Sequence, residues 1–424
     1  MKKNLIPIRF VLVFCTFLLT VLLYIDRACI SAAKGDISSD LGFSMTDFGW
    51  IMAVFTLGYA LFQTPAGKLA DSKGARGVIA GIVTIWSFLT AFTGFAWSYT
   101  SMLAIRFLFG AGEAGAFPAL SKVVYNWFPI SERGIIQGIN FSGSRIGAAF
   151  AMPLVAWMLN EIGWRHTFLV FGLFGILYSV SWFLIFREKP EQGRFIGSKE
   201  VEYITKNRQQ SEPGVKKVLP FSTILKSVTM WKTMIQYICS NFTFYFSLTW
   251  MYPYIQERFQ LGLVEAGFYT SIPLVAGAVG NWLAGILVDA IYRNGKWKLS
   301  RRLPAIIGFA LSAIGMIMVT QVSSPVLSVA FMALAVFGAD MTLSPSWAFC
   351  IDIGKENAGA VSGTMNMAGN LGAFVTIIAF PYLFKWTGHY EPFFFICASL
   401  SIVAIVMWST LNPEKSMTNE SKNN

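Results

Sequence analysis

Apolar stretches long enough to cross a membrane recur along this chain of 424 residues, and they restrict its fold more than any other feature. A hydrocarbon core of about 30 Å is crossed by a helix of about 20 apolar residues, whose backbone polar groups all bond internally. The pattern predicts twelve such helices. They lie at about 8–33, 47–67, 77–96, 101–123, 136–158, 165–186, 233–256, 266–289, 303–321, 325–350, 359–384 and 391–411.

Composition and charge support a multi-pass membrane protein. The chain is 55% hydrophobic and 13% charged, whereas soluble domains carry about 25% charged residues. Most of its Lys and Arg residues fall at the termini and in the even-numbered loops, which predicts that both termini lie in the cytoplasm. The net charge of +11 thus reports topology rather than a nucleic-acid partner. We expect a location in the inner (cytoplasmic) membrane, with the lipid bilayer as a partner.

A polar segment at 187–232, which holds ten basic residues, separates two apolar halves. It is too short and too polar to form a catalytic domain, so we expect a linker, with a surface helix near Glu200–Arg208, and no enzyme. The predicted fold is an all-α membrane protein with two pseudo-symmetric six-helix bundles. The predicted domains are 1–190, a linker at 191–230, and 231–424 with a short cytoplasmic tail.

Two charged pairs lie inside predicted spans. In Arg106-Phe-Leu-Phe-Gly-Ala-Gly-Glu113 the two charges are seven residues apart, which places them about 10 Å apart on one face of a helix. Asp26 and Arg27 form the second pair. Charges at this depth cost several kcal/mol and usually face a cavity where they act on a ligand. A structural ion pair between helices is the alternative.

A short motif occurs in both halves, which is typical of secondary transporters built from repeats. Gly67-Lys-Leu-Ala-Asp71-Ser-Lys-Gly74-Ala-Arg76 follows the second span, and a second copy containing Asp289 follows the eighth. The first copy resembles the loop signature of the major facilitator superfamily. That resemblance implies the fold predicted above, with Asp71 and Arg76 at an inner gate.

Further stretches narrow the resemblance to the anion:cation symporters of that superfamily. This branch includes bacterial hexuronate, galactonate and glucarate transporters, sialin and the vesicular glutamate transporters. The resemblance covers about residues 8–411. The stretches that carry it are Tyr24-Ile-Asp-Arg27-Ala-Cys-Ile-Ser31, Arg106 to Pro118, Asn140-Phe-Ser-Gly-Ser144-Arg, Ser344-Pro-Ser-Trp347-Ala-Phe-Cys-Ile-Asp352 and Ser362-Gly-Thr-Met-Asn366-Met-Ala-Gly-Asn370.

The resemblance assigns roles to the intramembrane charges. It implies that Arg27 is the principal substrate arginine and that Arg106 couples substrate to protonation through Glu113. Independently of the resemblance, a guanidinium suits an organic anion because its planar fork binds a carboxylate through two charge-assisted hydrogen bonds. Other predicted substrate contacts, for which ordinary packing is the alternative, are Tyr24, Tyr59, Ser144, Ser344, Trp347, Asn366 and, more weakly, Asn370.

Asp26 and Glu113 are the predicted proton carriers. Burial raises the pKa of a carboxyl group, whereas a neighbouring arginine lowers it. A substrate that competes for the arginine therefore alters the protonation of the carboxyl group, and the two ligands become coupled. We expect proton-coupled uptake of a small organic anion by alternating access, without a cofactor. A sodium-driven mechanism is the alternative.

The substrate remains open at this stage. Sugar acids such as hexuronates or aldonates are the leading expectation, with aromatic or dicarboxylic acids as alternatives. Arg145 is unexpected in a sugar-acid transporter and could bind a second carboxylate, pair with Glu161 or another helix, or lie near the membrane surface. Asp340 in the tenth span could be a further proton site or an arginine partner. The protein is expected to work as a monomer.

Overall fold

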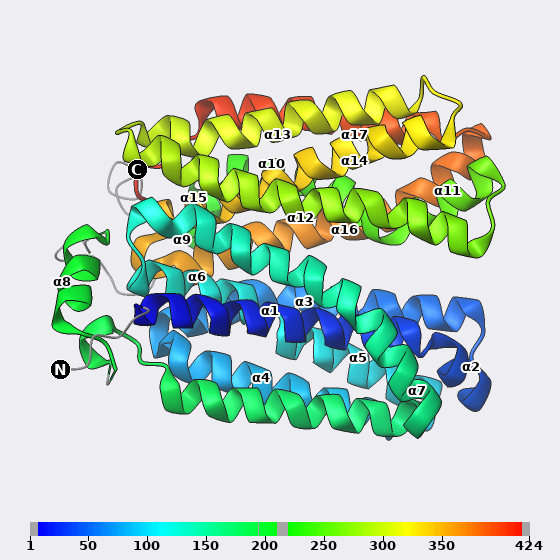
Figure 1. Cartoon of the computed structure of the whole chain (residues 1–424), viewed down its shortest axis with the longest axis horizontal. Coiled ribbons are helices and arrows are strands. Elements are labelled where there is room, and N and C mark those ends of the chain that lie inside the picture. Colours follow the sequence, from blue (N-terminus) through cyan, green and yellow to red (C-terminus); the bar gives the residue numbers. More distant parts are fainter. Residues whose placement is uncertain (1–6, 194, 210–218, 418–424) are drawn as a thin grey trace. The chain divides into compact units, whose positions relative to one another are not determined.

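The computed structural model describes all residues except 1–6, 194, 210–218 and 418–424. Each predicted span coincides, apart from a few residues at its ends, with one helix, with two consecutive helices or with part of a longer helix (Figure 1). Three predicted spans are each formed by two consecutive helices, namely α5 (Tyr99–Glu113) with α6 (Ala116–Trp127), α10 (Val228–Thr249) with α11 (Met251–Phe259), and α14 (Pro325–Met341) with α15 (Leu343–Gly354). The other spans are formed by α1 (Ile8–Ala32), α3 (Met45–Lys73), α4 (Ala75–Thr93), α7 (Arg133–Ile185), α12 (Leu263–Arg293), α13 (Trp297–Val319), α16 (Ala358–Thr387) and α17 (Glu391–Thr410).

Helix α7 contains the fifth and sixth predicted spans. Gly163 divides it, because this residue has φ 72° and ψ 167°, a backbone conformation that glycine tolerates best. Eight stretches of the described residues are long and apolar enough to cross a membrane by length and composition, and Pro325–Thr387 counts as one of them. Shorter helices are α2 (Lys34–Leu41), α8 (Ser198–Asn207), α9 (Phe221–Lys226), η1 (Ile130–Glu132), η2 (Pro190–Gln192) and η3 (Lys355–Asn357).

The chain divides into two compact units, whose boundaries differ in detail from a simple division at the linker. The first ten residues of α7 belong to the second unit, whereas the start of α16 belongs to the first. Unit 1 comprises Met1–Ile130, Gly143–Leu219 and Gly354–Met367, and unit 2 comprises Ser131–Ser142, Pro220–Ile353 and Ala368–Asn424.

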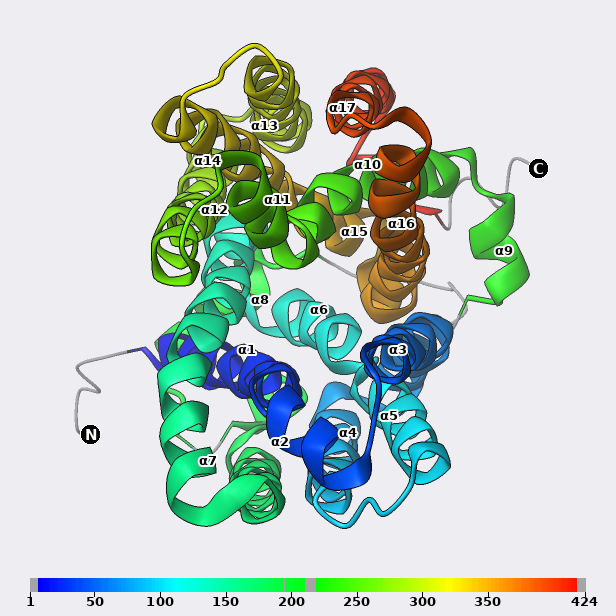
Figure 2. The ribbon, with the colours of Figure 1, turned by 90° about the vertical axis from the view of Figure 1, so that its right-hand side faces the viewer.

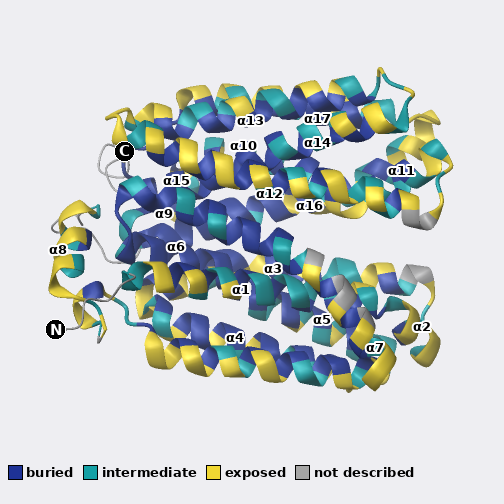
Figure 3. Cartoon of the chain, viewed as in Figure 1, coloured by how far each residue is buried: buried dark blue, intermediate teal, exposed yellow. Residues whose placement is uncertain are grey.

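In unit 1, α3 packs closely along α5, and α4 packs against both of them (Figure 2). Large apolar side chains cover the outer faces of α4 and of the second half of α7, where Ile85, Phe88, Leu177 and Phe183 are each about half exposed (Figure 3). A contiguous apolar surface of this kind suits contact with lipid. Lipid contact explains these apolar outer faces but does not explain the polar side chains that are buried inside the unit.

In unit 2, α14 packs against both α12 and α13. An aromatic cluster closes one end of this unit. Phe246 contacts the rings of Phe380, Phe393 and Phe394, with ring centroids 5.2 to 5.4 Å apart. Clustered aromatic rings add packing energy beyond the area that they bury.

The predicted linker helix is confirmed as α8. Its Glu200 side chain accepts hydrogen bonds from the backbone amides of Ile8 and Arg9, each at 3.0 Å. These amides open α1, whose Pro7 cap supplies no side-chain hydrogen bond of its own. A carboxylate is favourable at a helix N-terminus because it satisfies unpaired N–H groups and complements the helix dipole. The linker is therefore anchored to the first helix of unit 1.

Candidate functional site

The principal predicted residue, Arg27, lies inside a cage of aromatic rings in unit 1. Its guanidinium carbon is 4.4 Å from the ring centroid of Tyr59, 5.0 Å from Tyr24 and 5.2 Å from Phe55. A cation near several ring faces is stabilised by their quadrupoles, most strongly where water is excluded. The structure thus brings together three of the predicted contacts and adds Phe55, which the sequence did not single out.

Arg106 approaches the same aromatic group. Its guanidinium carbon lies 4.7 Å from the centroid of Phe55 and 4.8 Å from that of Phe109, and only 2% of the residue is exposed. Phe55 therefore contacts both guanidinium groups. A buried arginine and a partly buried one on the same ring form a strongly positive locus, which must be balanced by carboxylates or by an anion.

Glu113 supplies part of that balance. Nε of Arg27 donates to Oε1 of Glu113 at 3.1 Å and to Oε2 at 2.9 Å, and the glutamate side chain is fully buried. The resemblance had placed Glu113 with Arg106, which shares its helix. The structure shows instead that its hydrogen-bonded partner is Arg27 on α1, so the glutamate and a substrate carboxylate would compete for the same guanidinium.

Asp26, the other predicted proton carrier, is 1% exposed. Neither of its carboxylate oxygens makes a hydrogen bond of ordinary geometry among the described residues, although the indole of Trp86 is close enough to interact with it, and Glu113 and Arg106 act on it electrostatically. It does not pair with its neighbour Arg27, as expected for adjacent residues that point about 100° apart on a helix. Burial in an apolar region makes a carboxyl group costly when it is ionised, which fits a group that binds protons.

Glycine determines how closely the cage is assembled. A side chain added at Gly110 on α5 would collide with the backbone carbonyl of Phe55 on α3, and one at Gly58 on α3 would collide with the carbonyl of Phe107. The two backbones are therefore in direct contact, which membrane helices achieve with small residues. This contact holds the rings of Phe55 and Tyr59 against the charged face of α5.

The remaining predicted contacts in unit 1 are buried polar residues. Ser144 and Arg145 lie on α7 and Asn366 lies on α16, and each is less than a tenth exposed. Arg145 therefore does not lie at an exposed surface, whereas Glu161, one partner considered for it, is exposed.

In unit 2, three predicted residues make hydrogen bonds between helices. Ser344 Oγ donates to the carbonyl of Gly134 at 2.7 Å, and Trp347 Nε1 donates to the Tyr237 hydroxyl at 2.9 Å. Asn370 Oδ1 accepts from the hydroxyl of Tyr245 at 2.7 Å. These contacts correspond to the packing alternative. Asp340 is fully buried on α14 and accepts from Asn281 Nδ2 at 3.3 Å.

The two residues predicted to form a gate make separate contacts. Asp71 accepts hydrogen bonds from the amides of Gly359 at 3.0 Å and Ala360 at 2.7 Å, which open α16. Burial raises the pKa of Asp71 to about 7, although Lys122 at 4.0 Å and the two amides act in the opposite direction. Arg76 instead donates from Nε to the carbonyl of Phe183 at 2.9 Å.

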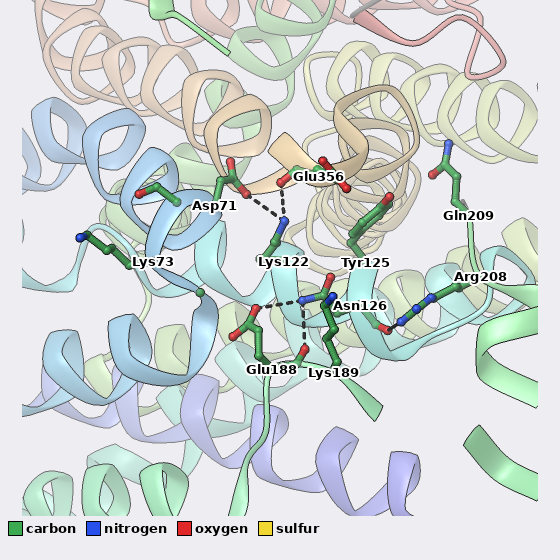
Figure 4. Close-up of a pocket in the computed structure, with 12 residues that line it drawn as sticks. Asp71, Lys73, Lys122, Tyr125, Asn126, Glu188, Lys189, Arg208, Gln209 and Glu356 are labelled. Carbon is green, nitrogen blue, oxygen red and sulfur yellow. Dashed lines mark hydrogen bonds and ion pairs between the residues drawn. The ribbon is translucent and has the colours of Figure 1, made fainter. Parts of the chain in front are cut away.

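A cavity of about 370 Å³ adjoins Asp71 in unit 1 (Figure 4). Lys122 lies at its wall and donates to the carbonyl of Glu356, while Asn126 donates to the carboxylate of Glu188 at 2.9 Å. The wall thus carries charges of both signs, and of these Lys122 and Asp71 form an ion pair at 4.0 Å. Its lining is Asp71, Ser72, Lys73, Gly74, Lys122, Tyr125, Asn126, Glu188, Lys189, Arg208, Gln209 and Glu356.

The second copy of the motif makes the equivalent contact in unit 2. Asp289 accepts from the amides of Gly134 at 2.8 Å and Ile135 at 2.7 Å, at the first turn of α7. Each copy therefore places a carboxylate on the N-terminus of a helix, so the repeat seen in the sequence is also a structural repeat. This equivalence holds although the basic residues that follow Asp289, beginning with Arg293, are spaced differently from those of the first copy.

A buried charge cluster next to Asp289 was missed by the sequence reasoning. Asp352 forms ion pairs with Arg133 and with Nε of Arg301, the latter at 2.8 Å, and all three side chains are fully buried. Trp297 Nε1 donates to the same carboxylate at 2.9 Å. Both arginines had been counted only as loop charges that set topology. Asp352 at the end of an apolar span was the available signal.

Comparison with known proteins identifies the class. Residues 16–377 and 295–424 match the sequence profile of the Major Facilitator Superfamily. The structure is similar to that of a proton:xylose symporter bound to 6-bromo-6-deoxy-D-glucose, with a TM-score of 0.74 and 16% identity over 97% of this chain and 98% of that one. Because the two sequences are only 16% identical, this similarity establishes the fold alone. The protein is a multi-pass membrane transporter and not an enzyme.

Relatives with higher identity specify the family further. A probable galactarate/D-glucarate transporter of Escherichia coli is 31% identical over 95% of this chain and 93% of its own. A probable sulfoacetate transporter of Cupriavidus necator is 30% identical over 92% and 90%, and a hexuronate transporter of Bacillus subtilis is 28% identical over 92% and 91%. The chain belongs to the Major Facilitator Superfamily, and its relatives match the predicted anion:cation symporter branch.

Proposed function

We propose that this protein imports small organic anions, with sugar acids as the substrate class, in symport with protons. The observation that carries the proposal is the shared contact of Arg27 and Arg106 with Phe55, beside a glutamate that bonds to only one of them. In the proposal, Arg27 receives the substrate carboxylate and its aromatic cage excludes water. The relatives named for galactarate, glucarate, hexuronate and sulfoacetate support an anionic substrate.

The charges of the site provide the coupling. Arg27 and Arg106 contribute two positive charges, which Asp26 and Glu113 balance when both carboxyl groups are ionised. Each proton that binds there leaves one positive charge unbalanced in a low-dielectric region, which favours one negative charge of substrate. A substrate anion in turn favours proton uptake, because the coupling is reciprocal. No cofactor is needed for this scheme.

The mechanism that we propose is alternating access by a monomer in the inner membrane, with both termini in the cytoplasm. The hydrogen bonds from the first turn of α16 to Asp71 would then break and re-form during the cycle. A carboxylate bonded to two backbone amides is strong enough to hold the helix and weak enough to release it, since each charge-assisted bond contributes about 1.5–3 kcal/mol.

Uptake by the purified full-length protein in proteoliposomes tests the proposal. Radiolabelled D-glucarate, D-galactonate, D-glucuronate, succinate and benzoate would each be supplied with an imposed pH gradient, an imposed sodium gradient or neither. We expect accumulation of a sugar acid that depends on the pH gradient. Accumulation driven only by sodium would overturn proton coupling, and a preference for succinate or benzoate would overturn the sugar-acid substrate class. Exchange that is insensitive to both gradients would overturn symport.

Arg27→Ala provides the site-specific test. Loss of one charge-assisted, bidentate carboxylate contact is expected to weaken binding by at least about thirtyfold, which corresponds to about 2 kcal/mol. Arg165→Ala is the matched control, because Arg165 is a partly exposed arginine that pairs with Asp40 at 2.8 Å. Isothermal titration of the detergent-solubilised protein measures both. Equal affinities of wild type and Arg27→Ala would refute the assigned role.

A further inference from the structure

Gln63 on α3 is a buried residue to which the mechanism above gives no role. It is 0% exposed, and neither its Oε1 nor its Nε2 has a hydrogen-bond partner among the described residues. A buried polar group left without a partner costs about 1–3 kcal/mol, so native proteins rarely keep one without a reason. A ligand that occupies the site part of the time is one such reason.

The position of Gln63 links it to the arginine site. It follows Tyr59 by four residues and Phe55 by eight, so the three side chains lie on one face of α3, about 6 Å apart per step. Side chains on a helix lean toward its N-terminus, which directs the amide of Gln63 toward Tyr59. Tyr59 in turn contacts the guanidinium of Arg27.

A second buried glutamine provides a comparison, because its side-chain amide makes hydrogen bonds to the protein at both ends. Gln236 on α10 is also fully buried, but its Nε2 donates to the carbonyl of Thr233 at 3.0 Å. Its Oε1 accepts from Trp408 Nε1 at 3.0 Å and from Ser346 Oγ at 3.3 Å. Both ends of that amide make hydrogen bonds, whereas within the described part of the chain neither end of the Gln63 amide makes one.

The chemistry of an amide selects its ligand. A carboxylate only accepts hydrogen bonds and an aromatic ring offers neither a strong donor nor a strong acceptor, but a hydroxyl group does both. An amide with an unused donor and an unused acceptor therefore matches a hydroxyl group. Resting on the proposed function, we infer that Gln63 binds a substrate hydroxyl while Arg27 holds the carboxylate, and that Gln63 selects hydroxylated acids over acids without hydroxyl groups.

Two acids with the same skeleton test the inference. D-glucarate and adipate are both six-carbon dicarboxylates, and only the first carries hydroxyl groups. Where the wild type binds a monoacid instead, D-gluconate and hexanoate form the equivalent pair. Binding to full-length wild type and Gln63→Leu would be measured by isothermal titration. We expect the variant to lose about tenfold in affinity for the hydroxylated acid and to retain its affinity for the other, as expected for about one hydrogen bond.

Thermal unfolding of the ligand-free proteins separates this role from a structural one. Gln63→Leu removes two unpaired polar atoms, so its melting temperature should equal or exceed that of the wild type. Gln236→Leu, the matched control, leaves Trp408 Nε1 and Ser346 Oγ without Oε1 as an acceptor and should melt at a lower temperature. That control should leave the preference for the hydroxylated acid unchanged.

The failures of the inference and of the proposed function are distinct. A lower melting temperature for Gln63→Leu, or an equal loss of affinity for both acids, would overturn the inference while leaving anion transport intact. Wild-type binding of adipate as tightly as glucarate would do the same. If the wild type bound none of these acids and none of the panel above, the proposed function would fail, and the inference with it.

Discussion

Replacing Glu113 by glutamine should free the site from its dependence on protons. In the structure, both carboxylate oxygens of Glu113 accept from Nε of Arg27, at 3.1 and 2.9 Å. An arriving substrate carboxylate must therefore share this guanidinium with Glu113 or wait until the glutamate is protonated. Glu113→Gln imitates the protonated state permanently, since glutamine keeps an acceptor but carries no charge.

The size of the effect follows from the distance between the competing groups. Two carboxylates on one guanidinium lie about 5 Å apart, and at an effective dielectric constant of about 20 their repulsion amounts to about 3 kcal/mol. Removing it should strengthen substrate binding at pH 8 by up to about a hundredfold. Binding to the variant should also vary less with pH, because one proton no longer accompanies the anion.

Isothermal titration between pH 5.5 and 8 measures the substrate affinity and its pH dependence, and proteoliposome uptake measures the coupling of transport to the pH gradient. The variant should exchange internal for external substrate but should not accumulate it when a pH gradient is imposed. Glu161→Gln is the control, because it makes the same chemical change at an exposed position.

Two results would refute this reasoning. One is accumulation by Glu113→Gln that still follows the pH gradient. The other is a variant whose affinity at pH 8 is no higher than that of the wild type and keeps the same pH dependence. Either would show that the proton travels on another group, such as Asp26.

Two further predictions concern other parts of unit 1. Burial raises the pKa of Asp71 to about 7 from an ordinary value near 4, so between these pH values the closed contact with Gly359 and Ala360 holds a proton that the opened form has lost. The stability that this proton gives the closed contact is fully present below about pH 4 and is lost as the pH rises through 7, by up to about 1.4 kcal/mol per pH unit. Hydrogen exchange of the Gly359 and Ala360 amides, corrected for intrinsic rates, should therefore speed up toward pH 8. In Asp71→Asn, which cannot ionise, exchange should lack this pH dependence and should be no faster than that of the wild type at pH 8; equal slopes would contradict the assignment. Gly110→Ala should collide with the backbone of α3 and lower the stability of the protein by about 1–3 kcal/mol. Gly112→Ala is the control and should cost less, because its added methyl group would meet only the side chain of Ile85, at 3.0 Å. Equal melting temperatures of the two variants would argue against close packing of α3 on α5.

Local patterns predicted the helices, because apolar length and the cost of a buried charge can both be assessed along a single chain. All twelve spans and the linker helix were found in this way, and intramembrane charges marked Arg27 and Arg106 as functional candidates. The repeated glycine–aspartate motif was also visible, because duplication leaves the same spacing in both halves. Family resemblance added the superfamily and its organic-anion branch.

Partners of these residues could not be predicted from local patterns. Glu113 is on the same helix as Arg106 but bonds to Arg27, which lies 86 residues away, and Asp71 bonds to an amide 288 residues away. Such pairs depend on which helix faces meet, and that choice is made by backbone contacts such as the one at Gly110. Spacing within one helix is a poor guide when the competing partner lies on another.

The sequence by itself determined where the long apolar helices and the linker lie, and it marked Asp26, Arg106 and Glu113 as charges at membrane depth, since hydrophobic length and charge cost are properties of each segment alone. Only the tertiary structure decided that Glu113 neutralises Arg27 and that Phe55 contacts both arginines. It also decided that the amide of Gln63 finds no partner in the part of the chain that the structure describes, whereas that of Gln236 makes hydrogen bonds at both ends. The reason is physical: hydrogen bonds and ring contacts act over a few ångströms, so they depend on how helices distant in sequence pack together.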